Sequence, residues 1–368
     1  MRRRLFATVW IFIELAIAAG SGRAADDALA EARRIVEAAT QPAAPWNGPR
    51  TGPPAQSGKH VVILGEDLRN GGILGVAQGV REAARVIGWS VAVFDASGSA
   101  ERRRKVLAEA LAGRIDGLML IGPDARDMLP GLLPYAQRGI PIVGWHVAPH
   151  AGPVAGTPVA MNVSTDPLEV ARVTALAAIV QAKGRAGVVV FTDTHYELPK
   201  TKANAMVEVV RACAGCTLLE LSDVAISRNA ELMPQKAREL LSRYGRRWTH
   251  ALAINDIYFD YAAPVLTQAG LANDAVSMLS AGDGSAAAFL RIRAGTFQTG
   301  TVAEPLNLHG WQMVDEMNRL FAKEPVSGYV HPVHLVTPDN IASDGGDRLQ
   351  YDPANGYRDV YRRIWQRP

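Results

Sequence analysis

Short apolar runs that alternate with segments of helical spacing constrain the fold of this chain most strongly. Val61-Val62-Ile63-Leu64 is continuously apolar, and apolar residues then recur at helical spacing from Leu74 to Ile87. A run that is apolar at every position indicates a strand covered on both faces, so the alternation predicts a parallel sheet between helices. The first series of predicted elements comprises strands over 60–66, 90–96, 117–122, 141–145 and 158–163, and helices over 74–87, 100–111 and 128–137.

A second series of the same kind follows, without a strict sequence repeat of the first. Its predicted strands cover 186–191, 217–221, 250–254, 277–281 and 299–302, and its helices cover 166–182, 202–212, 229–244 and 259–269. The chain is 48% apolar and 20% charged, which is ordinary for globular domains. The predicted fold class is therefore α/β, with two similar open parallel-sheet lobes.

The first 24 residues have the order of a secretory signal peptide. Met1–Arg4 is cationic, Leu5–Ala19 is apolar, and Gly22-Arg23-Ala24 resembles a cleavage site. A membrane anchor is the alternative, but the apolar run is shorter than the ~20 residues of a typical span and contains Glu14. We predict an exported protein cleaved near Ala24, followed by a proline-rich arm over 25–58.

Charge and cysteine content narrow the function. The formal net charge is +3, and the predicted leader carries an excess of three positive charges, so no basic field on the remaining chain indicates nucleic-acid binding. Cys213 and Cys216 are the only cysteines. In an oxidising compartment they can form a small structural disulfide, with free thiols or a redox or metal role as alternatives. Two ligands alone make a poor zinc site, so no metal and no cofactor are predicted.

Polar side chains follow the predicted strands of both series. In open parallel sheets, ligands bind at the carboxyl ends of the strands, so these side chains should line one cleft if the lobes face each other. The candidates that follow strands of the first series are Asn70, Trp145 and His146, and those of the second are Tyr196, Asn255, Asp283 and Glu304.

The ordered set of these segments resembles the type I periplasmic binding proteins, especially the sugar-binding branch. The resemblance covers about residues 60–335 and rests on Leu68–Gly72, Asp116–Gly122, Gly139–Val143, Ile254–Asp256 and Ala281–Gly284. It implies lobe 1 over 59–165 and 304–336, and lobe 2 over 166–303 and 337–368. It also implies three hinge crossings, near residues 165, 303 and 337.

Carried over residue by residue, the resemblance gives a mixed set of ligand positions. Asn255 and Asp283 match the family pattern, and Asn70 falls at a hydroxyl-binding asparagine. His146 replaces an aspartate, Lys200 replaces an arginine, and Glu304 replaces a glutamine. Gly72 and Ile73 replace an aromatic pair, so Trp145 or Tyr196 would have to supply a stacking face.

Each candidate also has a purely structural alternative. Asp283 could shape its own Asp-Gly turn, and Asn255 could cap the following helix. Glu304 could form a hinge ion pair, and Lys200 could be a solvated lysine at a helix start. Trp145 could be a core residue, and a lone His146 is weak evidence for a metal.

The resemblance implies a monomeric periplasmic protein that binds a small polar ligand (a sugar, a polyol or an amine-bearing solute). It would deliver that ligand to the membrane permease of an ABC importer. A subunit that presents the ligand to a receptor kinase or chemoreceptor would have the same fold and site. An enzyme acting on a sugar is disfavoured, because the chain contains no dinucleotide fingerprint, phosphate loop or nucleophile elbow.

Overall fold

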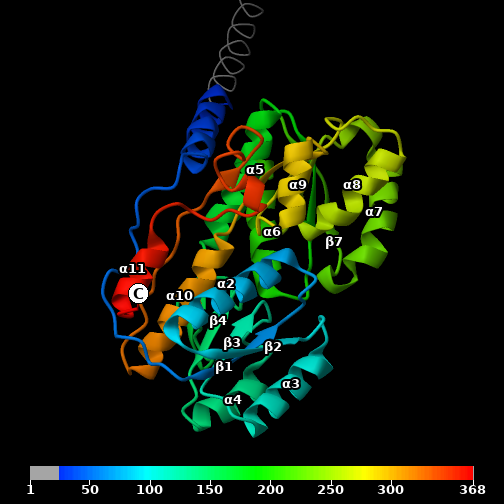
Figure 1. The fold of residues 1–368 in the computed structure, drawn as a ribbon. Helices are drawn as coiled ribbons and strands as arrows, with labels where there is room; N and C mark the ends of the chain where they lie inside the picture. The colour runs from blue at the N-terminus through cyan, green and yellow to red at the C-terminus, as the bar shows by residue number, and fades with distance from the viewer. Residues whose placement is uncertain (1–24, 368) are drawn as a thin grey trace, which may run out of the picture.

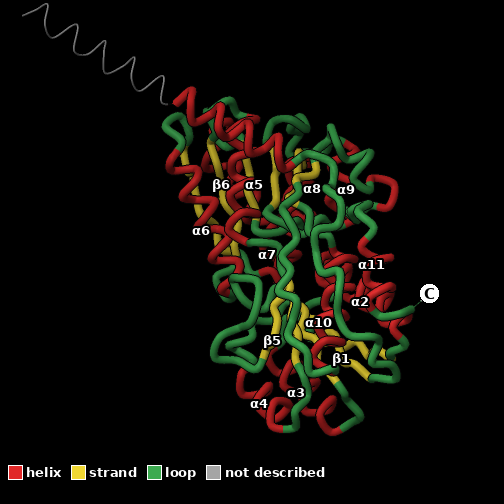
Figure 2. The backbone as a smooth tube through the Cα atoms, turned by 90° about the vertical axis from the view of Figure 1, so that its left-hand side faces the viewer, coloured by secondary structure: helices red, strands yellow, loops and turns green. Residues whose placement is uncertain are grey.

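The structure is a computed structural model that describes residues 25–367, and the predicted signal peptide lies outside that range. Two α/β lobes lie one above the other, each with its own central sheet (Figures 1 and 2). Within the described residues, no helix combines the length and the hydropathy that crossing a membrane requires. The predicted fold class is confirmed.

The first lobe contains a five-stranded parallel sheet in the order β2-β1-β3-β4-β5. Its apolar strands are buried on both faces, as the continuous runs predict. One apolar cluster lies between the sheet and helices α2 and α10 (Leu306–Phe321), and another lies under α3 and α4. The elements are β1 (His60–Gly65), α2 (Gly71–Ile87), β2 (Ser90–Asp95), α3 (Ala100–Ala112), β3 (Gly117–Ile121), α4 (Leu129–Gln137), β4 (Ile142–Trp145) and β5 (Val159–Val163).

The second lobe contains a six-stranded sheet in the order β11-β10-β9-β8-β6-β7. All neighbours are parallel except β11, which pairs antiparallel with β10. The elements are α5 (Pro167–Gln181), β6 (Gly187–Thr192), α6 (Glu197–Ala212), β7 (Thr217–Asp223), α7 (Asn229–Tyr244), β8 (His250–Ala253), α8 (Ile257–Gln268), β9 (Ser277–Ser280), α9 (Ala286–Ala294), β10 (Gln298–Val302) and β11 (Leu335–Val336). A disulfide joins Cys213 and Cys216 in the turn between α6 and β7.

Three segments carry the chain between the lobes. The first joins β5 to α5, the second joins β10 to α10 (Leu306–Phe321), and the third returns from α10 to β11. Helix α10 belongs to the first lobe and packs closely on α2. The approach is close enough that a Cβ on Gly310 would lie only 2.4 Å from the backbone of Gly79, so a glycine is needed there. The amino-acid pattern did not predict α9, α10 or the C-terminal helix α11 (Tyr357–Ile364).

The N-terminal arm spans both lobes on the side of these crossings. A helix over residues 25–39 packs on the core of the second lobe through Ile35, Val36 and Ala39. The chain then runs to the first lobe (Figure 1). There Trp46 packs among Tyr329, Tyr357 and Tyr361.

The C-terminal tail corrects the predicted division of the lobes. We predicted that 337–368 belongs to lobe 2, and this is wrong for its last part. Tyr357, Tyr361 and Trp365 recur every four residues, so they share one face of α11. That face packs on Trp311 of α10 in the first lobe, with the rings of Trp311 and Trp365 stacked at 5.4 Å. Only the earlier part of the tail, around Ile341 and Tyr351, packs on the second lobe.

Candidate functional site

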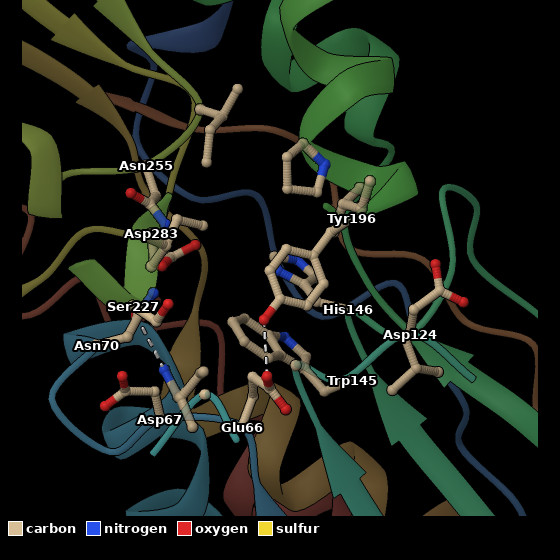
Figure 3. A pocket seen from close by; sticks show the side chains of 18 of the residues that line it. Glu66, Asp67, Asn70, Asp124, Trp145, His146, Tyr196, Ser227, Asn255 and Asp283 are labelled. Atoms are coloured by element: carbon tan, nitrogen blue, oxygen red, sulfur yellow. Dashed lines mark hydrogen bonds between the residues drawn. The ribbon is translucent and has the colours of Figure 1, made fainter. Parts of the chain in front are cut away.

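A pocket lies between the two lobes, at the carboxyl ends of strands from both sheets (Figure 3). Including the open solvent at its mouth, the space between the lobes at this point is about 760 Å³. Apolar walls come from both lobes, and so do the polar side chains. The polar lining residues are Glu66, Asp67, Asn70, Asp124, His146, Tyr196, Lys202, Ser227, Asn255 and Asp283.

Asn70 and Asp283 meet across the gap between the lobes. The Asn70 side chain caps α2 by accepting a hydrogen bond from the backbone N–H of Gly72 at 2.9 Å. Asp283, on the loop after β9, lies against the same helix start, where a Cβ on Gly72 would be 2.4 Å from its Oδ2 atom. The absent side chain of Gly72 therefore allows the second-lobe loop to approach the first lobe.

Burial governs the charge of Asp283. The side chain is 6% exposed, and burial raises its pKa to about 7, although the nearby Lys202 and a hydrogen bond with Asn70 oppose the rise. The loop around it is held by Asp256, whose Oδ2 accepts hydrogen bonds from the backbone N–H groups of residues 283, 284 and 285 at 2.8–3.1 Å. Asp283 is thus fixed in place by a buried acceptor beneath it.

Asn255 lies beside Asp283 on the pocket wall, at the carboxyl end of β8 (Figure 3). Its side chain is buried, and its Oδ1 atom has no hydrogen-bond partner. The helix that follows has Asp256 at its N-cap position and no side-chain cap bond, so Asn255 is not used as a cap. A buried amide oxygen without a partner costs free energy that a bound hydroxyl or amine could recover.

Tyr196 bridges the two lobes at one side of the pocket. Its hydroxyl donates to Glu66 Oε1 of the first lobe at 2.7 Å (Figure 3). Arg103 of α3 forms an ion pair with the same carboxylate. Burial raises the pKa of Glu66 against the opposing effects of Tyr196 and Arg103, and its Oε2 atom has no partner.

Trp145 and His146 form a stacked pair on the pocket wall, with ring centroids 3.7 Å apart and nearly parallel planes. The Trp145 ring is buried, and its Nε1–H donates to Nδ1 of His309 at 3.0 Å. His146 covers one face of the indole, and both residues line the pocket. Burial lowers the pKa of His146, which keeps the imidazole neutral at neutral pH.

Glu304 does not line the pocket. It is buried behind His146, where its Oε2 accepts from Thr165 Oγ1 at 2.6 Å and its Oε1 lies 3.4 Å from His146 Nε2. Burial opposes ionisation of Glu304, but a hydrogen bond with His146 and the nearby Lys202 ammonium group lower its pKa. Because Glu304 and Thr165 stand at two of the chain crossings, Glu304 has the hinge position that was its structural alternative.

Lys200 does not line the pocket either. Its side chain is partly exposed and forms an ion pair with Glu197. The lysine that lines the pocket is Lys202, which is 2% exposed and donates from Nζ to the carbonyl of Ala281 at 2.7 Å. The sequence contained a signal that Lys202 is the buried lysine. Lys202 lies four residues from both Leu198 and Met206, on the apolar face of α6, where a lysine needs a specific partner.

No group of three or more histidine, cysteine, aspartate or glutamate side chains is placed to hold a metal ion within residues 25–367. The polar side chains instead converge on the space between the lobes, and their acceptors outnumber their donors. Such an arrangement can enclose a small polar molecule on all sides when the lobes are together.

A family model described as a periplasmic binding protein domain matches residues 61–325. The chain belongs to this family. Its matched range runs from β1 into α10 and the turn after it, and so includes both sheets except β11.

Solved structures support the same fold. An ABC sugar transporter subunit from Rhodobacter sphaeroides has 19% identity and a TM-score of 0.66, covering 77% of this chain and 99% of that one. A solute-binding protein from Agrobacterium vitis with bound allitol has 17% identity and a TM-score of 0.67, covering 78% and 98%. A Caulobacter myo-inositol binding protein has 16% identity and a TM-score of 0.67, covering 79% and 97%. A search of curated proteins found no match.

Proposed function

We propose that this protein binds a small polar solute, a sugar or polyol, in the periplasm and delivers it to the permease of an ABC importer. The observation that carries the proposal is the pocket between the lobes, in which Asn70 and Glu66 of one lobe face Asp283, Asn255 and Tyr196 of the other. Contacts from both sides allow a ligand to stabilise the closed arrangement, which is how hinge closure couples to binding.

The chemistry of the lining supports a hydroxyl-rich ligand. Carboxylate and amide oxygens accept hydrogen bonds from hydroxyl groups, and the Asn255 and Glu66 oxygens without partners supply such acceptors. Apolar walls at Ile73, Leu198 and Ile254 suit the C–H surface of a sugar ring. Structures of the same fold carry allitol, myo-inositol and D-allose. We propose binding without turnover by a monomer, with its signal peptide removed near Ala24.

A ligand screen by differential scanning fluorimetry tests the proposal. The chain without residues 1–24 is heated with each of a panel of hexoses, pentoses, hexitols and inositols. A ligand that binds only the folded state stabilises it by about 2.7 kcal/mol at one hundred times its dissociation constant. We expect at least one member of the panel to raise the melting temperature in a concentration-dependent way, with isothermal titration calorimetry giving one site per chain.

Paired variants locate the site. Asn255→Ala and Asp283→Ala remove lining groups, whereas Asn273→Ala and Asp274→Ala change exposed residues of the same types on the loop before β9. The first pair should abolish the shift, and the second pair should leave it unchanged. An equal shift in all four variants would place the binding site elsewhere, and a panel without any binder would refute a sugar or polyol as the solute.

A further inference from the structure

The charges of the pocket are unequal. Four carboxylates line it (Glu66, Asp67, Asp124 and Asp283), against one lysine, Lys202. Neutral His146 adds no positive charge, because burial lowers its pKa. The balance therefore depends on which carboxylates have a cationic partner outside the lining.

Two of the four carboxylates are compensated. Glu66 pairs with Arg103 of α3, and Asp67 pairs with Arg69, whose Nη2 lies 2.6 Å from Asp67 Oδ2 and whose Nε donates to Oδ1 at 2.9 Å. Neither arginine lines the pocket: Arg103 is mostly buried, whereas Arg69 is largely exposed and donates from Nη2 to the carbonyl of Ser227 in the other lobe at 3.3 Å. These two acids are held in place with their charge already matched.

In the described part of the chain, neither of the other two carboxylates has a cation of its own. Asp124 forms no ion pair within the described residues, and the pKa of its carboxyl is raised by burial. Asp283 shares Lys202 with the buried Glu304, and both carboxylates interact with that single ammonium group. Lys202 is also tethered, since Nζ donates to the carbonyl of Ala281.

A buried carboxylate without its own cation either takes up a proton or attracts a cation. The pKa of Asp283, raised to about 7 mainly by burial, indicates that the carboxyl is partly protonated in the empty pocket at neutral pH. An ammonium group of a ligand placed beside Asp283 would keep the carboxylate ionised and form a charge-assisted hydrogen bond with it. Partner-free acceptors on Glu66 and Asn255 remain for the hydroxyl groups of the same ligand.

We infer that the pocket selects a compact polyhydroxylated solute that carries a protonated amine, such as an amino sugar or an aminocyclitol, over its neutral counterpart. Asp283 is the partner of the ammonium group. The inference rests on the proposed function, because it names the ligand class of the same pocket.

Matched ligand pairs test the inference by isothermal titration calorimetry. The pairs are D-glucosamine with D-glucose, D-galactosamine with D-galactose, D-mannosamine with D-mannose, and scyllo-inosamine with scyllo-inositol, together with the N-acetyl form of each amino sugar. For the pair that binds, we expect the amine to bind about 10-fold more tightly or better, the difference made by one hydrogen bond to a charged group. N-acetylation, which removes the charge, should abolish the advantage.

Asp283→Asn removes the charge with little change of shape, and Asp274→Asn is the control on an exposed loop. The first variant should lose the preference for the amine while retaining weak binding of both members of the pair, and the control should behave as the wild type. If a neutral member binds as tightly as its amine, the inference is wrong and the proposed function stands. If no amine and no neutral sugar or cyclitol binds, both are wrong.

Discussion

Asp283→Asn also makes a prediction about the free energy of unfolding that needs no ligand. The carboxyl has an ordinary pKa of 3.8, and burial between the lobes raises it to about 7. Between these two values the folded protein binds a proton that the unfolded chain does not. The contribution of this carboxyl to the free energy of unfolding is therefore fully present below the unfolded pKa, and it is lost as the pH rises to and through the folded pKa. The rise from 3.8 to about 7 corresponds to at most about 4 kcal/mol.

The assay is urea unfolding at a series of pH values from about 4 to 8, with wild type, Asp283→Asn and Asp274→Asn compared at each pH. Other ionisable groups affect all three proteins alike, so the difference between wild type and Asp283→Asn isolates one carboxyl. We expect that difference to move against the wild type by about 1.4 kcal/mol per pH unit between pH 4 and 7, as much as ~4 kcal/mol in all, and to level off above pH 7. The Asp274→Asn curve should stay parallel to the wild type.

A constant offset between wild type and Asp283→Asn across the whole range would refute the reasoning. It would mean that water reaches the carboxyl, and hence that the lobes do not enclose Asp283 in solution. The same outcome would remove the argument that this residue attracts an ammonium group.

Three other predictions concern separate parts of the molecule. Burial lowers the pKa of His309 to about 3, so below about pH 6.5 the unfolded chain binds a proton that the folded protein does not. The melting temperature of the wild type should therefore fall relative to that of His309→Gln as the pH is lowered to 4. A difference between the two melting temperatures that does not change with pH would contradict this. Gly72→Ala places a Cβ 2.4 Å from Oδ2 of Asp283, so ligand affinity should fall about 10-fold or more, with little loss of stability to urea. Trp46→Ala removes a buried indole that packs on three tyrosines and should cost about 3–5 kcal/mol in urea unfolding, whereas a cost below ~1 kcal/mol would show that the arm is not docked.

The fold was largely predictable, because its strands are apolar runs whose burial follows from their composition. The helices that were not predicted lack such a clear pattern of apolar and polar residues. Helix α10 buries Gln312, Asp315 and Asn318 along with its apolar residues, so polarity does not mark its exposed face. Asn318 and Asp315 have partners in distant parts of the chain: Asn318 donates to the carbonyl of Pro53, and Asp315 accepts from Nε1 of Trp365. Such pairings are set by tertiary structure and have no local pattern.

The candidate site was predictable to the extent that its position follows from topology. Six of the eight predicted residues line the pocket, because each lies at or shortly after the carboxyl end of a strand that faces the gap. Lys200 and Glu304 do not line it, and the reason differs for each. Lys200 lies two residues, about half a helical turn, from the inward position that Lys202 occupies, and Glu304 turns inward beneath His146 to the hinge. The positions of the strand ends alone do not determine the directions in which the side chains of Lys200 and Glu304 point.

The central claim is that the two lobes close on a ligand held between them, and an inter-lobe distance measures this directly. Spin labels at Glu101→Cys on α3 and Glu231→Cys on α7 stand on opposite lobes at exposed positions, and the native cysteines are already joined to each other. Pulsed electron–electron double resonance should give a broad distribution without ligand and a single shorter distance with a saturating ligand from the screen. An identical distribution in both states, at full occupancy by calorimetry, would contradict the claim.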